Sequence, residues 1–179
     1  MRTLRTFAAA AIATVGVLGL AAPAQAMGTG NPYQDMQVGV TYTVYEPSYT
    51  AGLTLQHFGG NAVCPKGTEQ NSLGVYGKAS ARQFSIWEGN PMCQGIGIGA
   101  TVLTATVDGA KATIQAYCDP ASKKACTKAD VLKYGGNLQV TLPAAKGLRP
   151  TTVWIETFGT KNLSAQQLLK IARRMTAVQ

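Results

Sequence analysis

The stretch "ATVLTATVDGAKATIQAYC" (100–118) constrains the fold more than any other part of this sequence, because apolar and polar residues alternate on both sides of Asp108-Gly109. Alternation with a period of two is typical of half-buried strands, and Asp-Gly is a favoured two-residue hairpin turn. If Val107 pairs with Ala110, the apolar residues of both arms share one face and the threonines share the other. The sequence therefore predicts an antiparallel hairpin here.

Other segments show the same alternation less strongly. In "QVGVTYTVY" (37–45) four apolar residues alternate with glycine, threonine and tyrosine, and Pro47 ends the pattern. We expect His57 to share a strand face with Leu53 and Leu55, which favours a structural or surface histidine over a general base. Strands are predicted at 37–45, 52–58, 73–78, 83–88, 137–142 and 151–158.

The segment 164–175 has the spacing of an amphipathic helix. Ser164, followed three residues later by Gln167, forms a capping-box pattern. The apolar positions at helical spacing are Ala165, Leu168, Leu169, Ala172 and Met175, and the opposite face carries Gln166, Lys170, Arg173 and Arg174. Burial at about 25 cal/mol per Å² outweighs the roughly 0.3–1 kcal/mol of each exposed cation, so we expect the helix mainly to cover a sheet. A second, short helix is predicted after Thr127.

The N-terminal segment 1–26 has the pattern of a secretory signal peptide. Arg2 and Arg5 precede an apolar run, and Ala24-Gln25-Ala26 supplies small residues for cleavage. An uncleaved membrane anchor is the alternative, but a spanning helix would have to include Pro23. We expect a released protein with a flexible segment at 27–36 and one domain at 37–179.

Four cysteines, Cys64, Cys93, Cys118 and Cys126, follow the predicted signal peptide. Because disulfides persist in exported proteins, we expect two bridges. Three connectivities are possible, and proximity favours Cys64 with Cys93 and Cys118 with Cys126. A zinc site is the competing interpretation, but the sequence has no CxxC pair and only one histidine, so we expect no metal.

Positive charge concentrates in the second half of the chain. Residues 27–108 hold three cations against five carboxylates, whereas residues 109–179 hold eleven against three. Lys170, Arg173 and Arg174 are therefore predicted to bind an anionic partner, which outside a cell is a wall polymer, an acidic glycan or a lipid surface rather than nucleic acid. The alternative is a solvated surface that only keeps the protein soluble.

The sequence lacks the usual motifs of catalysis. It contains no GxSxG elbow, HExxH helix or GxxxxGK[ST] loop, so serine hydrolases, metalloproteases and nucleotide-binding proteins are disfavoured. "GIGIGA" (95–100) has the wrong spacing for a dinucleotide loop, and its glycines are better explained by a neighbouring aromatic or a bulge. Glu88 and Glu156 each lie close after a strand tryptophan, and they would suit glycosidase chemistry only if they converged.

Three segments, "VYEPSYTAGL" (44–53), "VDGAKATIQAY" (107–117) and "TTVWIETFGTKNLSAQQLLKIARRM" (151–175), carry a resemblance. Across most of residues 41–175 the chain resembles small extracytoplasmic domains of bacterial sporulation and anti-sigma-factor-like proteins. The resemblance implies a curved antiparallel sheet, a tryptophan-bearing last strand, a closing helix and a noncatalytic sensing or binding module. The chain departs from that pattern in its cysteines and in the expected lack of a membrane anchor.

These observations predict a secreted α+β protein, in which a long C-terminal helix packs on a curved antiparallel β-sheet and a second short helix is present. We expect it to be extracellular or cell-wall associated and to bind an anionic partner without a cofactor and without catalysis. The alternative is an inhibitor of an exported protease or other enzyme, presenting the loop "EGNPMCQG" (88–95). A hydrolase that uses unfamiliar carboxylates is a third hypothesis.

Overall fold

The computed structural model describes residues 28–61, 69–93, 97–118 and 124–178, so the predicted signal peptide lies outside the described residues. The described chain is mostly β-sheet with three short helices, so the predicted α+β class is wrong. The helices are α1 (Pro32–Val38), α2 (Lys128–Tyr134) and α3 (Ala165–Ala172). The strands are β1 (Tyr45–Pro47), β2 (Leu55–Asn61), β3 (Asn71–Gly77), β4 (Gln83–Gly89), β5 (Ala100–Val107), β6 (Ala110–Ala116), β7 (Gly136–Leu142), β8 (Thr151–Thr157) and β9 (Met175–Ala177).

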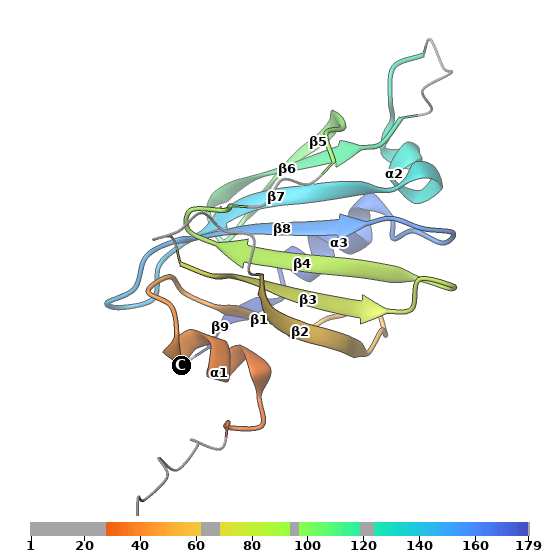
Figure 1. Ribbon diagram of the computed structural model, residues 1–179. Helices are drawn as coiled ribbons and strands as arrows, with labels where there is room; N and C mark the ends of the chain where they lie inside the picture. Colours follow the sequence, from red (N-terminus) through yellow and green to blue (C-terminus); the bar gives the residue numbers. More distant parts are fainter. Residues whose placement is uncertain (1–27, 62–68, 94–96, 119–123, 179) are drawn as a thin grey trace, which may run out of the picture.

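Seven strands form one antiparallel sheet in the order β2-β3-β4-β8-β7-β6-β5. Two meanders, β2-β3-β4 and β5-β6-β7-β8, meet where β4 pairs with β8 (Figure 1). Helix α3 contacts β5, β7 and β8 on one face of this sheet. Strands β1 and β9 form a separate two-stranded sheet, which brings the beginning and the end of the domain together.

The predicted hairpin is confirmed with its register. Val107 pairs with Ala110 across the turn, and the threonines of the two arms share the opposite face. Asp108 and Gly109 both have positive φ, 46° and 78°, which is the conformation that favours Asp-Gly in a two-residue turn.

A row of branched side chains forms the centre of the core. Ile86, Ile155, Leu138 and Ile114 are cross-strand neighbours on β4, β8, β7 and β6, and each is at most 1% exposed. Leu168 of α3 is also fully buried. Burial of each such side chain contributes about 1.5–3 kcal/mol, which explains why α3 packs on this face.

The predicted long C-terminal helix is wrong. The capping box of Ser164 and Gln167 starts α3 as predicted, but the helix ends at Ala172 and the chain enters β9 at Met175. Met175 is buried as expected, because this position falls on the buried face both in the predicted helix and in strand β9. Pairing of β9 with β1 determines which structure forms, and the β-branched Thr176 and Val178 favour that extended conformation.

The predicted strand at 37–45 is also wrong for most of its length. Asn31 caps α1 through its side chain, Pro32 occupies the first helical position, and the helix runs into the predicted strand as far as Val38. It also includes part of the segment 27–36, which we expected to be flexible. Strand β1 begins only at Tyr45. No helix in the described ranges has the length and apolar character needed to cross a bilayer.

Candidate functional site

One cation of α3 and the two that directly follow the helix line one open groove, which we call the basic groove. Its volume is about 380 Å³, and it is lined by Gln166, Leu169, Lys170, Arg173 and Arg174. No carboxylate belongs to this lining, and no described carboxylate lies within ion-pair distance of the three cations. The structure therefore brings together the three residues that the sequence predicted to bind an anion.

Local packing fixes where these cations lie. The fully buried Leu168 and Ile171 turn one side of α3 toward the sheet, which leaves the cations on the exposed side. The Lys170 ammonium lies 4.2 Å from the centroid of the Tyr49 ring, a cation–π distance. Arg173 Nε donates to the carbonyl of Thr106 at 3.4 Å.

The backbone at Arg174 joins the basic groove to the two-stranded sheet. Both the N–H and the hydroxyl of Ser48 donate to the Arg174 carbonyl, each at 2.8 Å. A planar guanidinium can donate two parallel hydrogen bonds to a phosphate or carboxylate. The groove thus has the chemistry of an anion site.

A second cavity lies beside β1, and the sequence did not predict it. We call it the Glu46 pocket, and its volume is about 340 Å³. It is lined by Gly30, Asn31, Pro32, Tyr33, Glu46, Pro47, Thr50, Leu53, Leu55 and Tyr76. Glu46 is the only ionisable carboxylate in this lining, and Asn31 Nδ2 donates to its Oε2 at 2.9 Å. In the sequence, the capping pattern Asn31-Pro32 indicated the start of α1, which forms one wall of this pocket.

Two tyrosines of the Glu46 pocket interact through their hydroxyl groups. Tyr33 of α1 and Tyr76 of β3 form a hydrogen bond between these groups, and both residues are buried. Burial raises the pKa of Tyr76 to about 12 and raises the pKa of Tyr33 further. Both phenols therefore remain neutral at neutral pH.

Glu88 is a fully buried carboxyl group on the core face of β4. Its Oε2 accepts the Tyr45 N–H at 2.8 Å, and its Oε1 has no hydrogen-bond partner in the described residues. Burial raises the pKa of Glu88 to about 8, and the hydrogen bond from Tyr45 lowers it only in part. Because the side chain is 0% exposed, we interpret this group as a determinant of stability, not a binding residue.

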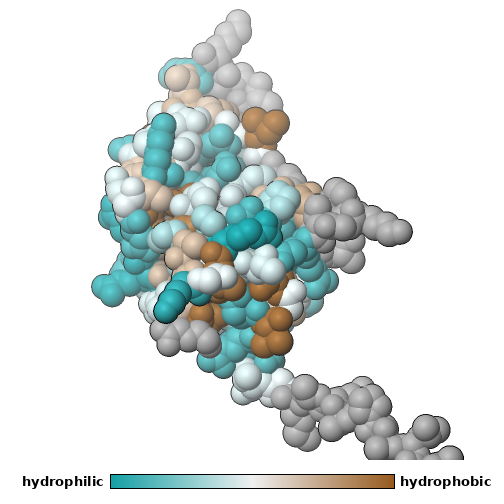
Figure 2. Space-filling model, turned by 90° about the vertical axis from the view of Figure 1, so that its left-hand side faces the viewer, coloured by the Kyte–Doolittle hydropathy of each residue, from teal (hydrophilic) through white to brown (hydrophobic). Residues whose placement is uncertain are grey.

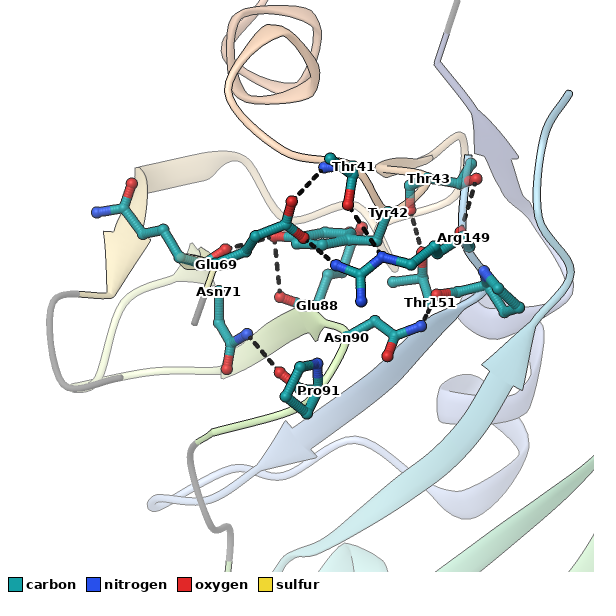
Figure 3. A network of polar contacts seen from close by, with 12 residues as sticks. Thr41, Tyr42, Thr43, Glu69, Asn71, Glu88, Asn90, Pro91, Arg149 and Thr151 are labelled. Atoms are coloured by element: carbon teal, nitrogen blue, oxygen red, sulfur yellow. Dashed lines mark hydrogen bonds and ion pairs between the residues drawn. The ribbon is translucent and has the colours of Figure 1, made fainter. Parts of the chain in front are cut away.

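A polar network holds the segment before β1 against the sheet (Figure 3). Arg149 forms an ion pair with Glu69 and donates from Nε to the Thr41 hydroxyl at 2.9 Å, while Thr41 N–H donates to Glu69 at 2.8 Å. Burial acts against ionisation of Glu69, but these hydrogen bonds and the Arg149 charge keep its pKa below the usual value. The Tyr42 hydroxyl donates to the Gln70 carbonyl at 2.8 Å. Within this network the charges of Arg149 and Glu69 neutralise each other.

The two carboxylates considered for glycosidase chemistry do not converge. Glu88 lies opposite Val153 on the core face, whereas Glu156 lies opposite Ser85 on the other face. On that second face Trp87 and Trp154 are half-buried cross-strand neighbours. Tyr117 donates to Glu156, which leaves this carboxylate in a structural contact.

His57 does not share a face with Leu55, contrary to expectation. A bulge between these residues pairs Leu55 with Tyr76 and His57 with Val75, so the bulge turns the His57 side chain away from the core face. His57 is exposed, in agreement with a surface histidine. Gly97 lies against a neighbouring aromatic ring, as predicted for the glycines of this segment. A Cβ at this position would lie 2.8 Å from the Tyr117 ring.

The predicted disulfide between Cys118 and Cys126 is confirmed. Cys93 is not a free thiol, and its predicted partner Cys64 lies outside the described residues. In the described part of the chain no three metal-ligating side chains come together.

The loop proposed for an inhibitor is attached to the sheet at its beginning. Asn90 Nδ2 donates to the Pro150 carbonyl at 2.6 Å, and Asn71 Nδ2 donates to the Pro91 carbonyl at 3.1 Å. The residues after Cys93 in this loop lie outside the described ranges.

No protein-family model, curated protein or solved structure matches this chain. Figure 2 shows one face of the molecule, on which hydrophobic residues form small groups among hydrophilic ones. A surface of this kind does not indicate a large apolar interface on that face.

Proposed function

We propose that this protein is a secreted, noncatalytic binding protein that attaches to an anionic polymer or surface of the cell envelope. The observation that supports the proposal is the convergence of Lys170, Arg173 and Arg174 in one groove whose lining contains no carboxylate. Cations placed together without a neutralising partner produce a local positive potential, which attracts anions and increases their rate of association.

Packing needs only the other face of α3. The buried face contains Leu168 and Ile171, whereas all three cations are exposed. Exposed charges at a helix end contribute only about 0.3–1 kcal/mol each to stability. The arrangement of the cations is thus free to serve binding, because folding depends little on it.

Binding to a purified anionic wall polymer tests this proposal. Wild-type protein should bind at about 50 mM salt and much more weakly at about 300 mM, because salt screens exposed charges. A variant with Lys170, Arg173 and Arg174 all changed to Gln should lose most of the binding at low salt. Its secondary structure and unfolding midpoint should stay close to wild type.

A second triple variant provides the matched control. Lys78, Lys128 and Lys146 are exposed cations outside the basic groove, and their change to Gln removes the same net charge. This control should retain most of the binding. Equal losses in the two variants would show that net charge alone is responsible, and the proposed site would then be wrong.

A further inference from the structure

The two-stranded sheet carries Glu46, and beyond one end of the sheet lies Arg174 of the basic groove. In the antiparallel register Glu46 pairs with Thr176, and two residues along each strand Ser48 meets Arg174 through the hydrogen bonds described above. Arg174 immediately precedes β9, and its hydrogen bonds with Ser48 continue the ladder beyond the strand, so Arg174 lies diagonally across from Glu46. One side of this small sheet carries the buried Tyr45 and Met175.

A third cavity lies beside the two-stranded sheet, next to the Glu46 pocket. It has a volume of about 530 Å³ and is lined by Gln34, Glu46, Pro47, Ser48, Thr176, Ala177 and Val178. It shares Glu46 and Pro47 with the Glu46 pocket, and its Ser48 is hydrogen-bonded to the backbone of Arg174 in the basic groove. The third cavity and the basic groove share no lining residue, but the hydrogen bonds from Ser48 to Arg174 join their walls. We call the two cavities together the charged groove, which has cations at one end and one carboxylate at the other.

Neither end of this groove is neutralised within the described chain. Asn31 fixes one oxygen of the Glu46 carboxylate, and no described cation lies within ion-pair distance of it. Diagonal neighbours across an antiparallel pair are roughly 7–8 Å apart at Cα. The Glu46 and Arg174 side chains start from such positions, so one small ligand can contact both.

We propose that this groove binds a ligand that carries a phosphate and, a few bonds away, a primary ammonium group. The inference rests on the proposed function and names its ligand more closely. Arg174, together with Arg173 and Lys170, would hold the phosphate through charge-assisted hydrogen bonds. Glu46 would accept hydrogen bonds from the ammonium group, which is small enough to enter either cavity beside it.

Soluble probes test this inference directly on the whole protein. Ethanolamine phosphate carries both groups, whereas 2-hydroxyethyl phosphate has the same length and replaces the ammonium by a hydroxyl. Wild type should bind ethanolamine phosphate roughly tenfold more tightly, since a hydrogen bond to a charged group contributes about 1.5 kcal/mol or more. Calorimetric titration at low salt measures both affinities.

Two variants and one control identify the residues that are responsible for the difference in affinity between the two probes. Glu46→Gln should abolish the preference for ethanolamine phosphate and leave the affinity for 2-hydroxyethyl phosphate unchanged. Arg174→Gln should weaken both probes by a similar factor. Glu156→Gln removes a carboxylate from the far face of the main sheet and should change neither affinity.

The outcomes separate this inference from the proposed function. Equal affinity of wild type for the two probes overturns the inference, even if anionic polymer still binds and the proposed function stands. If neither probe binds and the wall polymer does not bind either, both proposals are wrong. Vesicles that contain phosphatidylethanolamine present the same group on a lipid; binding to them together with the free probe supports the inference and identifies a membrane source.

Discussion

Replacement of Glu88 by Gln should remove most of the pH dependence of stability between about pH 5 and about pH 9. The carboxyl group lies in the core between its cross-strand neighbours Ser72 and Val153, and among the described residues only the Tyr45 N–H donates to it. The amide oxygen of Gln can accept the same N–H, and the amide stays neutral at every pH in this range. The variant therefore keeps the shape of the side chain and removes its charge.

The sign and size of the effect follow from the pKa. Burial raises the pKa of Glu88 from 4.5 to about 8, so the folded protein binds this proton more tightly than the unfolded chain does. The stabilisation is fully present below about pH 4.5, decreases as the pH rises, and is lost above about pH 8. At about 1.4 kcal/mol per pH unit, the shift corresponds to roughly 5 kcal/mol of the free energy of unfolding.

Denaturant unfolding at a series of pH values, followed by tryptophan fluorescence, measures this effect. Wild type should lose stability steadily toward high pH, whereas Glu88→Gln should show a nearly flat profile and be the more stable protein at about pH 9. Glu69→Gln is the control, because the pKa of Glu69 is lowered and its change should leave the slope above about pH 6 as in wild type. Parallel profiles for wild type and Glu88→Gln would refute the reasoning.

Three further predictions concern the packing of α3, its cap and the disulfide. Leu168→Ala should lower the free energy of unfolding by about 2–5 kcal/mol, since the side chain is fully buried; a loss within surface scatter in chemical denaturation would contradict this packing. Ser164→Ala should cost about 1 kcal/mol by the same measurement, because its hydroxyl accepts the N–H of the third helical residue. Changing Cys118 and Cys126 together to Ser should cost about 2.5 kcal/mol, the chain-entropy value for a loop with a sequence separation of 8, and unchanged stability would show that the bridge adds nothing.

Short sequence patterns correctly predicted the elements whose geometry depends on residues close to them in the sequence. Asp108-Gly109 determines its hairpin register through turn conformation, and Ser164 with Gln167 determines where α3 begins. The same kind of signal was present at Asn31-Pro32, but the alternation after it favoured a strand and obscured α1. The exposed side of α3 was predicted correctly, whereas binding of an anion by Lys170, Arg173 and Arg174 stays a prediction.

Features that depend on pairing between distant segments could not be predicted. Helix α3 ends before Met175 because β9 pairs with β1, more than a hundred residues earlier in the chain. Burial of Glu88 depends on which face of β4 meets the core, and one bulge near His57 reverses the face of a whole strand segment. The Glu46 pocket combines α1, β1 and β3, so no single stretch of sequence contains its pattern.

The pairing of β1 with β9 also determines how the molecule responds to mechanical force. The pair Tyr45–Ala177 lies at the end of the ladder nearest the C-terminus, and the Val178 N–H extends the ladder to the Val44 carbonyl. Tension on the C-terminus therefore loads one end of an antiparallel ladder, and its hydrogen bonds open one after another instead of shearing together. Thr176 would leave its position opposite Glu46 before Arg174 is displaced, so a pull on this end would open the cavity that Thr176 lines before it disturbs the basic groove.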